Sequence, residues 1–258
     1  MAQDVWNPER YDRFRDERRR PFFDLLALVR PRPGMRVVDL GCGSGELTAE
    51  LHRHLRAADT LGLDSSAAML AKSDAFAADG LRFARGDIAD FASGPTHDLV
   101  FSNAALHWLP AHEALFARLT AALAPGGQLA VQMPANFDHP SHTVAAEVAA
   151  EPSFRDALGG RAHAADNVRA PEDYARILDR LGYADQHVRL QVYGPHLASR
   201  EEVVAWTSGT LLTDYERRLS PDDYARFVAR FRERLMPRLE DTRPYFFTFK
   251  RLLLWGLR

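Results

Sequence analysis

The sequence contains one cysteine, Cys42, and only two lysines, Lys72 and Lys250, among its 258 residues. A single cysteine excludes an intramolecular disulfide and a metal site built from several cysteines, and it favours a reducing, cytoplasmic setting. We expect no bound metal. Nearly all of the 33 basic residues are arginines, so one arginine taken alone is weak evidence for an anion site.

Long apolar runs and an excess of one charge are also lacking. No run approaches the roughly 20 apolar residues that a membrane-spanning helix needs, and the charged N-terminus lacks the apolar core of a signal peptide. The formal net charge of −2 provides no basic field that would attract nucleic acid. We therefore expect a cytoplasmic monomer with no membrane and no nucleic-acid partner.

Glycines, by contrast, are concentrated in residues 37–45, Val-Val-Asp-Leu-Gly-Cys-Gly-Ser-Gly, where an apolar run ends in three glycines two residues apart. Leucines then recur every four residues from Leu47 to Leu55, as on the apolar face of a helix. The pattern predicts a strand, a tight loop and a helix that together bind a nucleotide. Glycine lets a bound group approach the backbone and permits positive φ. The cofactor-contact candidates here are Asp39, Gly41, Cys42, Gly43 and Gly45.

The spacing of these glycines bears on which nucleotide binds. A dinucleotide fold requires Gly-x-Gly-x-x-Gly, but counting from Gly41 the third glycine falls at Gly45, and Glu46 occupies the position of the pattern's last glycine. A carboxylate in the first helical turn repels a pyrophosphate and tolerates a sulfonium and an ammonium. The spacing therefore favours S-adenosylmethionine over NAD, although Glu46 would also simply complement the helix dipole.

A second strand is predicted over residues 60–64 and ends in Asp64, about 20 residues after the glycine loop. Such folds place a carboxylate there to accept hydrogen bonds from both ribose hydroxyls, and the alternative is a polar strand end. Ser65 or Ser66 would cap the next helix, which carries Met69. We take Asp64, Ser65 and Met69 as cofactor contacts.

Two further strands are predicted over residues 81–84 and 98–102, each followed by polar positions. Asp87 could accept a hydrogen bond from the adenine amine while Ile88 packs on the ring, and an ordinary Gly-Asp turn is the alternative. Ligands of open parallel sheets bind outside the carboxyl ends of the strands. The segment that follows residue 102 should therefore face the cofactor through Asn103, Ala104 and Trp108. A fifth strand over residues 128–133 follows.

The N-terminal segment is predicted to form two helices. Residues 8–20 are predicted to form a charged helix that Pro21 kinks or restarts, and residues 22–29 form a second amphipathic segment. This region either covers a sheet edge as a solvated helix or acts as a lid over the cofactor.

The C-terminal half is less regular. We expect helices over residues 172–181, 201–212 and 222–239 and strands over residues 188–193 and 245–255. The expected fold class is α/β: a Rossmann-like, mostly parallel seven-stranded sheet flanked by helices, with a C-terminal antiparallel strand pair and a helical cap.

With these motifs assembled, the sequence resembles the class I S-adenosylmethionine-dependent methyltransferases, most strongly over residues 33–134. Within that superfamily it is similar to the trans-aconitate methyltransferase family. The segments that carry this likeness are Trp-Asn-Pro-Glu-Arg-Tyr from Trp6, Asn-Ala-Ala-Leu-His-Trp from Asn103, Val-Gln-Met-Pro-Ala-Asn from Val131 and Trp-Thr-Ser-Gly-Thr from Trp206. The run Leu-Leu-Thr-Asp-Tyr after Thr210 departs from the family's Gly-Leu-Arg-Pro-Tyr type. The resemblance implies one domain over residues 1–258, with a lid (1–30), a cofactor-binding core (33–136), and cap helices plus the last two strands (137–258).

The resemblance also implies methyl transfer from S-adenosylmethionine to a carboxylate oxygen of a small polycarboxylic acid, most specifically trans-aconitate. A carboxylate with a pKa near 4 is ionised at neutral pH, so no general base is needed and we assign no catalytic side chain. His107 and Tyr11 would position the acceptor. A polyanionic substrate requires cations, preferably arginines. The substrate-binding candidates are Tyr11, Arg18, His107, Trp206, Arg243 and Arg251.

Three alternatives remain open at the level of sequence. The same fold could methylate a carbon acid or a carrier-bound acyl carboxylate, and a carbon nucleophile would make His107 a base. The chain could also be a non-catalytic cofactor-binding module that uses its cap to dock a partner. A dehydrogenase is the most distant reading, because Glu46 disfavours NAD.

Overall fold

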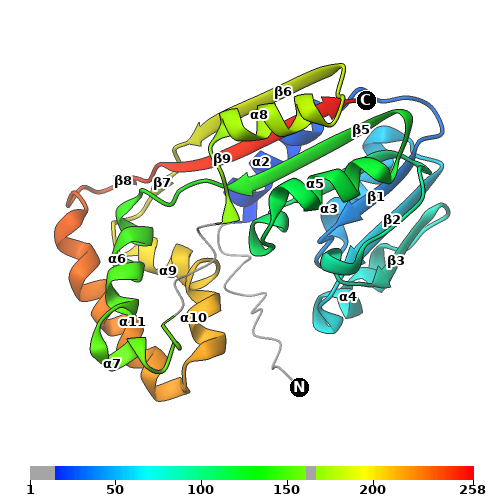
Figure 1. Cartoon of the computed structure of the whole chain (residues 1–258). Coiled ribbons are helices and arrows are strands. Elements are labelled where there is room, and N and C mark those ends of the chain that lie inside the picture. Colours follow the sequence, from blue (N-terminus) through cyan, green and yellow to red (C-terminus); the bar gives the residue numbers. More distant parts are fainter. Residues whose placement is uncertain (1–14, 161–166) are drawn as a thin grey trace. The chain divides into compact units, whose positions relative to one another are not determined.

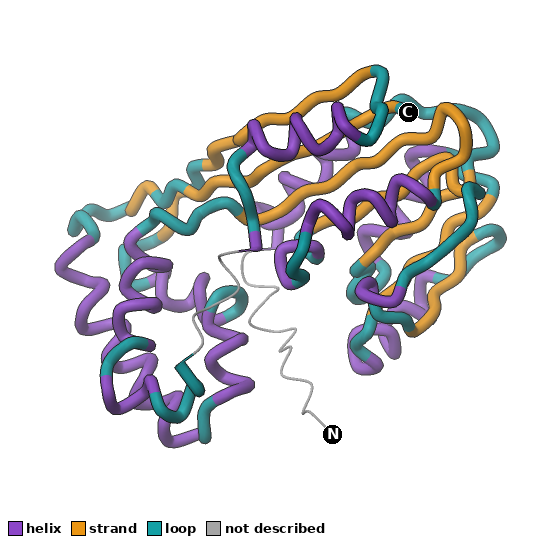
Figure 2. Tube along the Cα trace, viewed as in Figure 1, coloured by secondary structure: helices purple, strands orange, loops and turns teal. Residues whose placement is uncertain are grey.

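The computed structural model describes residues 15–160 and 167–258, with the side chains of residues 15–18 left aside. The chain forms two compact units. Among the described residues, the sheet unit comprises 19–134, 167–191 and 251–258, and the helical unit comprises 15–18, 135–160 and 192–250. Figure 2 shows strands concentrated in the sheet unit and helices dominating the helical unit.

The seven strands of the main sheet follow the order β3-β2-β1-β4-β5-β9-β6. The first five pair in parallel, and β9 pairs antiparallel with β5, with Gln128 opposite Leu257 and Pro134 opposite Arg251. The predicted mostly parallel sheet with a terminal antiparallel pair is therefore confirmed. The strands are β1 (Arg36–Leu40), β2 (Asp59–Asp64), β3 (Leu81–Arg85), β4 (His97–Asn103), β5 (Leu123–Pro134), β6 (Asp185–Tyr193) and β9 (Phe249–Leu257).

Helices cover both faces of this sheet, and Figure 1 shows α5 and α8 in front of it and α2 behind it. On the α2 face, Phe22 and Leu25 pack with Leu51 of α3 and Phe101 of β4 in one apolar core. Burying each such side chain contributes about 1.5–3 kcal/mol. The helices of the sheet unit are α2 (Arg15–Leu26), α3 (Glu46–Leu55), α4 (Ala67–Ser73), α5 (His112–Ala121) and α8 (Pro171–Arg180), with short 3-10 turns η1 (Asp74–Phe76), η2 (Ile88–Asp90) and η3 (Leu106–Trp108).

Helix α2 continues through Pro21, so the predicted restart of the helix at that residue was wrong. A proline inside a helix removes one backbone hydrogen bond and costs about 3 kcal/mol. The burial of Phe22, Leu25 and Leu26, each at most 2% exposed, offsets that cost. Packing against the sheet therefore overrides the local preference of proline.

The helical unit has its own core of aromatic and aliphatic side chains, including Trp206, Tyr215, Phe227 and Phe231. Its elements are α6 (Pro140–Ala149), α7 (Pro152–Arg155), α9 (Glu202–Ser208), α10 (Leu212–Arg218), α11 (Pro221–Leu235), η5 (Met236–Arg238) and the paired strands β7 (His196–Leu197) and β8 (Tyr245–Phe246).

Three C-terminal predictions needed correction. The helix expected over residues 201–212 ends at Gly209 and is followed by a separate helix, α10. The helix expected over residues 222–239 changes into the 3-10 turn η5 at Met236, immediately before Pro237, which cannot donate a backbone hydrogen bond. The strand expected over residues 245–255 is divided into β8 and β9. The spacing of apolar residues is the same on both sides of each break, so the sequence pattern did not reveal where the elements end.

Candidate functional site

The glycine loop that follows β1 adopts a backbone that other residues would strain. Gly41, Gly43 and Gly45 have φ values of +82°, +58° and +82°. A Cβ atom on Gly41 would lie 2.3 Å from the Cβ of Ala105, and one on Gly45 would lie 2.8 Å from the ring of Phe83. The loop therefore needs glycine both for its left-handed conformation and for close packing.

Hydrogen bonds from β2 hold this loop in place. The N–H groups of Gly41 and Cys42 donate to the Leu63 carbonyl oxygen at 2.8 and 3.0 Å. The Gly43 N–H donates to Asp64 Oδ2 at 2.8 Å, and the Ser66 N–H donates to Asp64 Oδ1 at 2.8 Å. The Asp64 carboxylate thus fixes the glycine loop, and each of its oxygens keeps a lone pair for a further donor.

A second carboxyl group lies buried in β1. Asp39 is 3% exposed, and its Oδ2 accepts a hydrogen bond from Thr48 Oγ1 of α3 at 2.6 Å. Burial raises the pKa of Asp39 to about 7, the Thr48 hydrogen bond opposes this rise, and the nearby Asp64 charge adds to it. Asp39 therefore ties the start of α3 to β1 beside the loop.

The segments after β2 and β3 converge on the same loop. Met69 Cε of α4 lies 3.2 Å from the position of a Cβ on Gly43, and Ile88 Cδ1 lies 3.6 Å from that of a Cβ on Gly41. Ser66 caps α4, since its hydroxyl accepts the Met69 N–H at 3.2 Å, whereas Ser65 is exposed. The structure thus brings the predicted cofactor contacts Met69 and Ile88 beside the glycine loop.

Asp87, also a predicted cofactor contact, is exposed and caps the turn η2. Its Oδ1 accepts the Ala89 N–H at 2.8 Å. This is the Gly-Asp turn of the alternative reading. It leaves the second carboxylate oxygen of Asp87 available to a ligand donor.

At the end of β4, Asn103 Oδ1 accepts a hydrogen bond from Gln132 Nε2 of β5 at 3.0 Å. Ala104 has a φ of +55°, and its N–H donates to the Gln132 carbonyl oxygen at 2.9 Å. Gln132 is 2% exposed, and its Oε1 has no hydrogen-bond partner among the described residues. The sequence interpretation did not identify Gln132 as the residue that holds Asn103, although a glutamine inside the apolar run 128–133 is a usable signal.

The turn η3 follows directly and carries two predicted site residues. His107 is 8% exposed, and the centroid of its ring lies 4.6 Å from that of Trp108. Asn167 Nδ2 donates to the His107 carbonyl oxygen at 3.1 Å. Asn103, Ala104, His107 and Trp108 therefore belong to one short segment, and the contact of Ala105 with Gly41 places that segment beside the glycine loop.

The first turn of α3 contains the carboxylate that guided the choice of nucleotide. Glu46 Oε1 accepts a hydrogen bond from Arg19 Nη1 of α2 at 2.7 Å, and both side chains are about three-quarters buried. Glu46 therefore has a structural partner in addition to the favourable helix dipole.

The predicted substrate contacts are distributed between the two units. Arg251 is a half-buried residue of β9 opposite Pro134 of β5. In the helical unit, Trp206 is 4% exposed and packs on Phe247 and Phe249 at ring-centroid distances of 5.2 and 5.1 Å, and Arg243 is exposed before a cis proline. Tyr11 and the side chain of Arg18 lie outside the described residues. These six assignments, His107 included, remain predictions.

The described part of the chain contains neither a metal-binding cluster nor a membrane-spanning helix. In residues 15–160 and 167–258, no cluster of three or more histidine, cysteine, aspartate or glutamate side chains is arranged to hold a metal ion. Over the same residues, no helix has the length and apolarity required to span a membrane.

Comparisons with known proteins place this geometry in context. The family model of a methyltransferase domain matches residues 37–127. Trans-aconitate 2-methyltransferase of Deinococcus radiodurans is 46% identical over 259 residues, covering 98% of this chain and 98% of that protein. The enzyme of the same name from Paracidovorax citrulli is 41% identical over 228 residues, covering 88% and 87%.

Solved structures show the same fold at low sequence identity. The YcgJ protein of Bacillus subtilis superposes with a TM-score of 0.61 at 13% identity, covering 93% of this chain and 98% of that chain. Phosphoethanolamine N-methyltransferase 2 of Haemonchus contortus, in complex with S-adenosyl-L-methionine, gives a TM-score of 0.56 at 17% identity, covering 93% and 52%.

Proposed function

This chain belongs to the trans-aconitate 2-methyltransferase family, and we propose that it transfers the methyl group of S-adenosylmethionine to a carboxylate oxygen of trans-aconitate. The products are a monomethyl ester and S-adenosylhomocysteine. The observation that carries the proposal is the 46% identity to a trans-aconitate 2-methyltransferase along 98% of both chains.

The site's residues fit the cofactor. Ala105 packs so closely against Gly41 that an added Cβ would lie 2.3 Å from its Cβ, which holds the segment after β4 against the loop proposed to bind the cofactor. The free lone pairs of the Asp64 carboxylate suit the ribose hydroxyls, and the Asp87 carboxylate suits the adenine amine. When bound, S-adenosylmethionine supplies an electrophilic methyl group. The full set of proposed contacts is Asp39, Gly41, Cys42, Gly43, Gly45, Asp64, Ser65, Met69, Asp87, Ile88, Asn103, Ala104 and Trp108.

The chain's own residues need not move a proton. The acceptor carboxylate is ionised at neutral pH, so the protein contributes by excluding water and holding the acceptor oxygen in line for attack. His107 and Tyr11 act in positioning. Burial raises the pKa of the Cys42 thiol far above its usual value, so Cys42 is a neutral packing residue and not a nucleophile.

The acceptor is a polyanion and requires cationic partners. Arg18, Arg243 and Arg251 are the proposed carboxylate ligands, because a guanidinium offers two parallel hydrogen bonds to one carboxylate. Tyr11, His107 and Trp206 complete the proposed substrate contacts. Within residues 1–30, the part before Phe22 serves as the lid in this proposal, since Phe22, Leu25 and Leu26 are packed in the core of the sheet unit. The chain as a whole forms one methyltransferase domain.

The cellular setting is also part of the proposal. The net charge of −2 and the single cysteine support a cytoplasmic monomer whose partner is a small carboxylate rather than a membrane or nucleic acid.

The test is methyl transfer from labelled S-adenosylmethionine to trans-aconitate, with cis-aconitate, citrate and a fatty acid assayed beside it. A clear preference for trans-aconitate, with ester as the product, is the expected result. Transfer to none of the four acids, with tight cofactor binding retained, would contradict the assignment of the acceptor. A pH-rate profile that depends on His107 would instead indicate a carbon acid as acceptor.

A further inference from the structure

The turn η3 is short and depends on contacts from outside itself. Its internal backbone hydrogen bonds are Trp108 N–H to the Ala105 carbonyl oxygen at 3.2 Å and Leu109 N–H to the Leu106 carbonyl oxygen at 3.0 Å. Hydrogen bonds of this 3-10 type have poor geometry and seldom sustain a long run. The orientation of His107 and Trp108 must therefore be fixed by neighbouring segments.

A buried chain of hydrogen bonds reaches the Leu106 carbonyl group. His112 Nε2 lies 3.1 Å from the Leu106 carbonyl oxygen, and His112 Nδ1 lies 2.5 Å from the Tyr174 hydroxyl oxygen. That hydroxyl oxygen accepts the Arg169 N–H at 3.2 Å. Leu106, His112 and Tyr174 are each at most 1% exposed, so water does not compete with these bonds.

The donor and the acceptor of each of these hydrogen bonds follow from the chemistry of the groups. A carbonyl oxygen only accepts, so His112 Nε2 carries the proton, and Nδ1 of the neutral ring accepts from the Tyr174 hydroxyl. Burial lowers the pKa of His112 and raises the pKa of Tyr174 to about 12. Both groups therefore remain neutral, and these hydrogen bonds have a single donor–acceptor order.

The segment that starts at Asn167 also contacts the second carbonyl group of the turn. Asn167 Nδ2 donates to the His107 carbonyl oxygen at 3.1 Å, and Arg169 Nη1 and Arg180 Nη2 lie 3.2 and 2.8 Å from Glu113 Oε1 in the first turn of α5. Residues 167–180 therefore hold η3 and the start of α5 together within the sheet unit.

We propose that His112, Tyr174 and Asn167 are positioning residues of the methyl-transfer reaction, because they fix the two carbonyl groups of η3 and thereby the orientation of His107 and Trp108. This inference rests on the proposed function. None of the three touches the cofactor or acceptor in this proposal; they act through the turn.

The chain offers a matched control in Tyr183. Its hydroxyl lies 2.8 Å from Thr120 Oγ1 near the other end of α5, it is 7% exposed, and burial raises its pKa to about 12 as it does for Tyr174. Tyr174→Phe and Tyr183→Phe each delete one buried hydroxyl bonded to α5. Only Tyr174 is connected to η3.

The experiment compares these variants in the full chain. We expect Tyr174→Phe to lower kcat/KM for trans-aconitate about tenfold relative to Tyr183→Phe, since small misplacements of reacting groups reduce rates strongly. Amide hydrogen exchange of residues 106–109 should accelerate in Tyr174→Phe and not in Tyr183→Phe. Asn167 is half-exposed, and Asn167→Ala should produce a smaller decrease in kcat/KM. This variant provides the test if Tyr174→Phe does not fold.

Equal kinetics and equal exchange in Tyr174→Phe and Tyr183→Phe would overturn the inference. So would unchanged kinetics and exchange in Asn167→Ala. Failure of the proposed function is a separate result: the wild-type chain would then not methylate trans-aconitate. The exchange rates of residues 106–109 would still show whether Tyr174 fixes the turn.

Discussion

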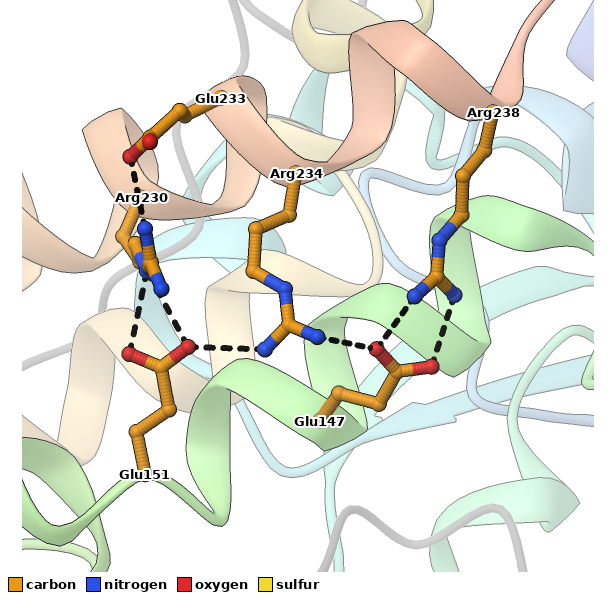
Figure 3. Close-up of polar contacts among 6 residues, drawn as sticks. All are labelled: Glu147, Glu151, Arg230, Glu233, Arg234 and Arg238. Carbon is orange, nitrogen blue, oxygen red and sulfur yellow. Dashed lines mark hydrogen bonds and ion pairs between the residues drawn. The ribbon is translucent and has the colours of Figure 1, made fainter.

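Both units carry exposed ion pairs, such as Arg169 and Arg180 with Glu113 in the sheet unit, but the sheet unit also buries an aspartate and a histidine. Asp39 and His112 are at most 3% exposed, and each is hydrogen-bonded within the unit. The helical unit places its charges outside, where arginines of α11 and η5 meet glutamates at the end of α6 and the start of α7 (Figure 3). Buried, directional hydrogen bonds specify one local geometry, whereas exposed ion pairs stabilise a surface without fixing atoms closely.

Two partly or fully buried groups, one in each unit, should respond to pH in opposite ways. The pKa of Asp39 is raised from 3.8 to about 7 by burial, so its contribution to stability is lost as the pH rises through that range. The pKa of His139 in the helical unit is lowered from 6.5 to about 4 by burial, so its contribution is lost as the pH falls from 6.5 towards 4. Substitutions in each unit test this contrast between buried and exposed polar groups.

The largest effect is expected at Gly41 in the sheet unit. Gly41→Ala introduces a Cβ at a φ of +82°, 2.3 Å from Ala105, and we expect cofactor affinity to fall at least about 100-fold as the loop shifts. Isothermal titration with S-adenosylhomocysteine measures the loss. Gly94→Ala is the matched control, because nothing lies within 4 Å of its added Cβ. Unaltered affinity in Gly41→Ala would show that the loop tolerates displacement.

Asp64 should have the next largest effect. Asp64→Ala removes the carboxylate that accepts the Gly43 and Ser66 N–H groups, together with the proposed ribose contact, so we expect affinity for S-adenosylhomocysteine to fall about 10–100-fold. Asp90→Ala, which removes an exposed carboxylate of η2, should leave that affinity unchanged. Equal affinities for the two variants would refute the ribose assignment.

The sheet unit was also the part most readily predicted from the sequence. Backbone conformation restricts which residue types can occur, and such restrictions are visible in a sequence. Positive φ and close packing required glycine at Gly41 and Gly45. The ends of parallel strands placed Asp64 and Asn103 at the same edge of the sheet. The contacts of His112 with Tyr174 join residues 62 positions apart, and nothing in local periodicity marks such a pair. The breaks at Gly209 and Pro237 were missed because apolar spacing continues across them.

The next effect is expected at His139 in the helical unit, the N-cap residue of α6. Its neutral Nδ1 accepts the Ser141 N–H at 3.1 Å, and protonation would end that hydrogen bond. His139→Asn keeps a capping acceptor without a titrating ring. We expect the wild-type Tm to fall by several degrees more than that of His139→Asn between pH 7.5 and pH 5, as thermal melts at both pH values would record. Parallel decreases would exclude His139 as the cause.

The smallest effect is expected in the ion-pair network of Figure 3, although it joins several arginines and glutamates. Arg234 lies 2.8 Å from both Glu147 Oε2 and Glu151 Oε1, and Arg238 contacts both oxygens of Glu147 at 2.7 Å (Figure 3). These side chains are about one-quarter to two-fifths exposed, so solvent and salt screen them. Arg234→Ala should therefore lower Tm by only about 2 °C at low salt.

That decrease should shrink further in 1 M NaCl, since the Debye length there is about 3 Å. Arg217→Ala is a suitable control, because the ion pair of Arg217 with Asp214 lies within the single helix α10. Kinetic constants for trans-aconitate should be the same in both variants and the wild type. A decrease in Tm that persists at 1 M NaCl would mean that Arg234 stabilises through packing of its aliphatic stem, and the contrast between the two units would then be one of burial rather than of charge.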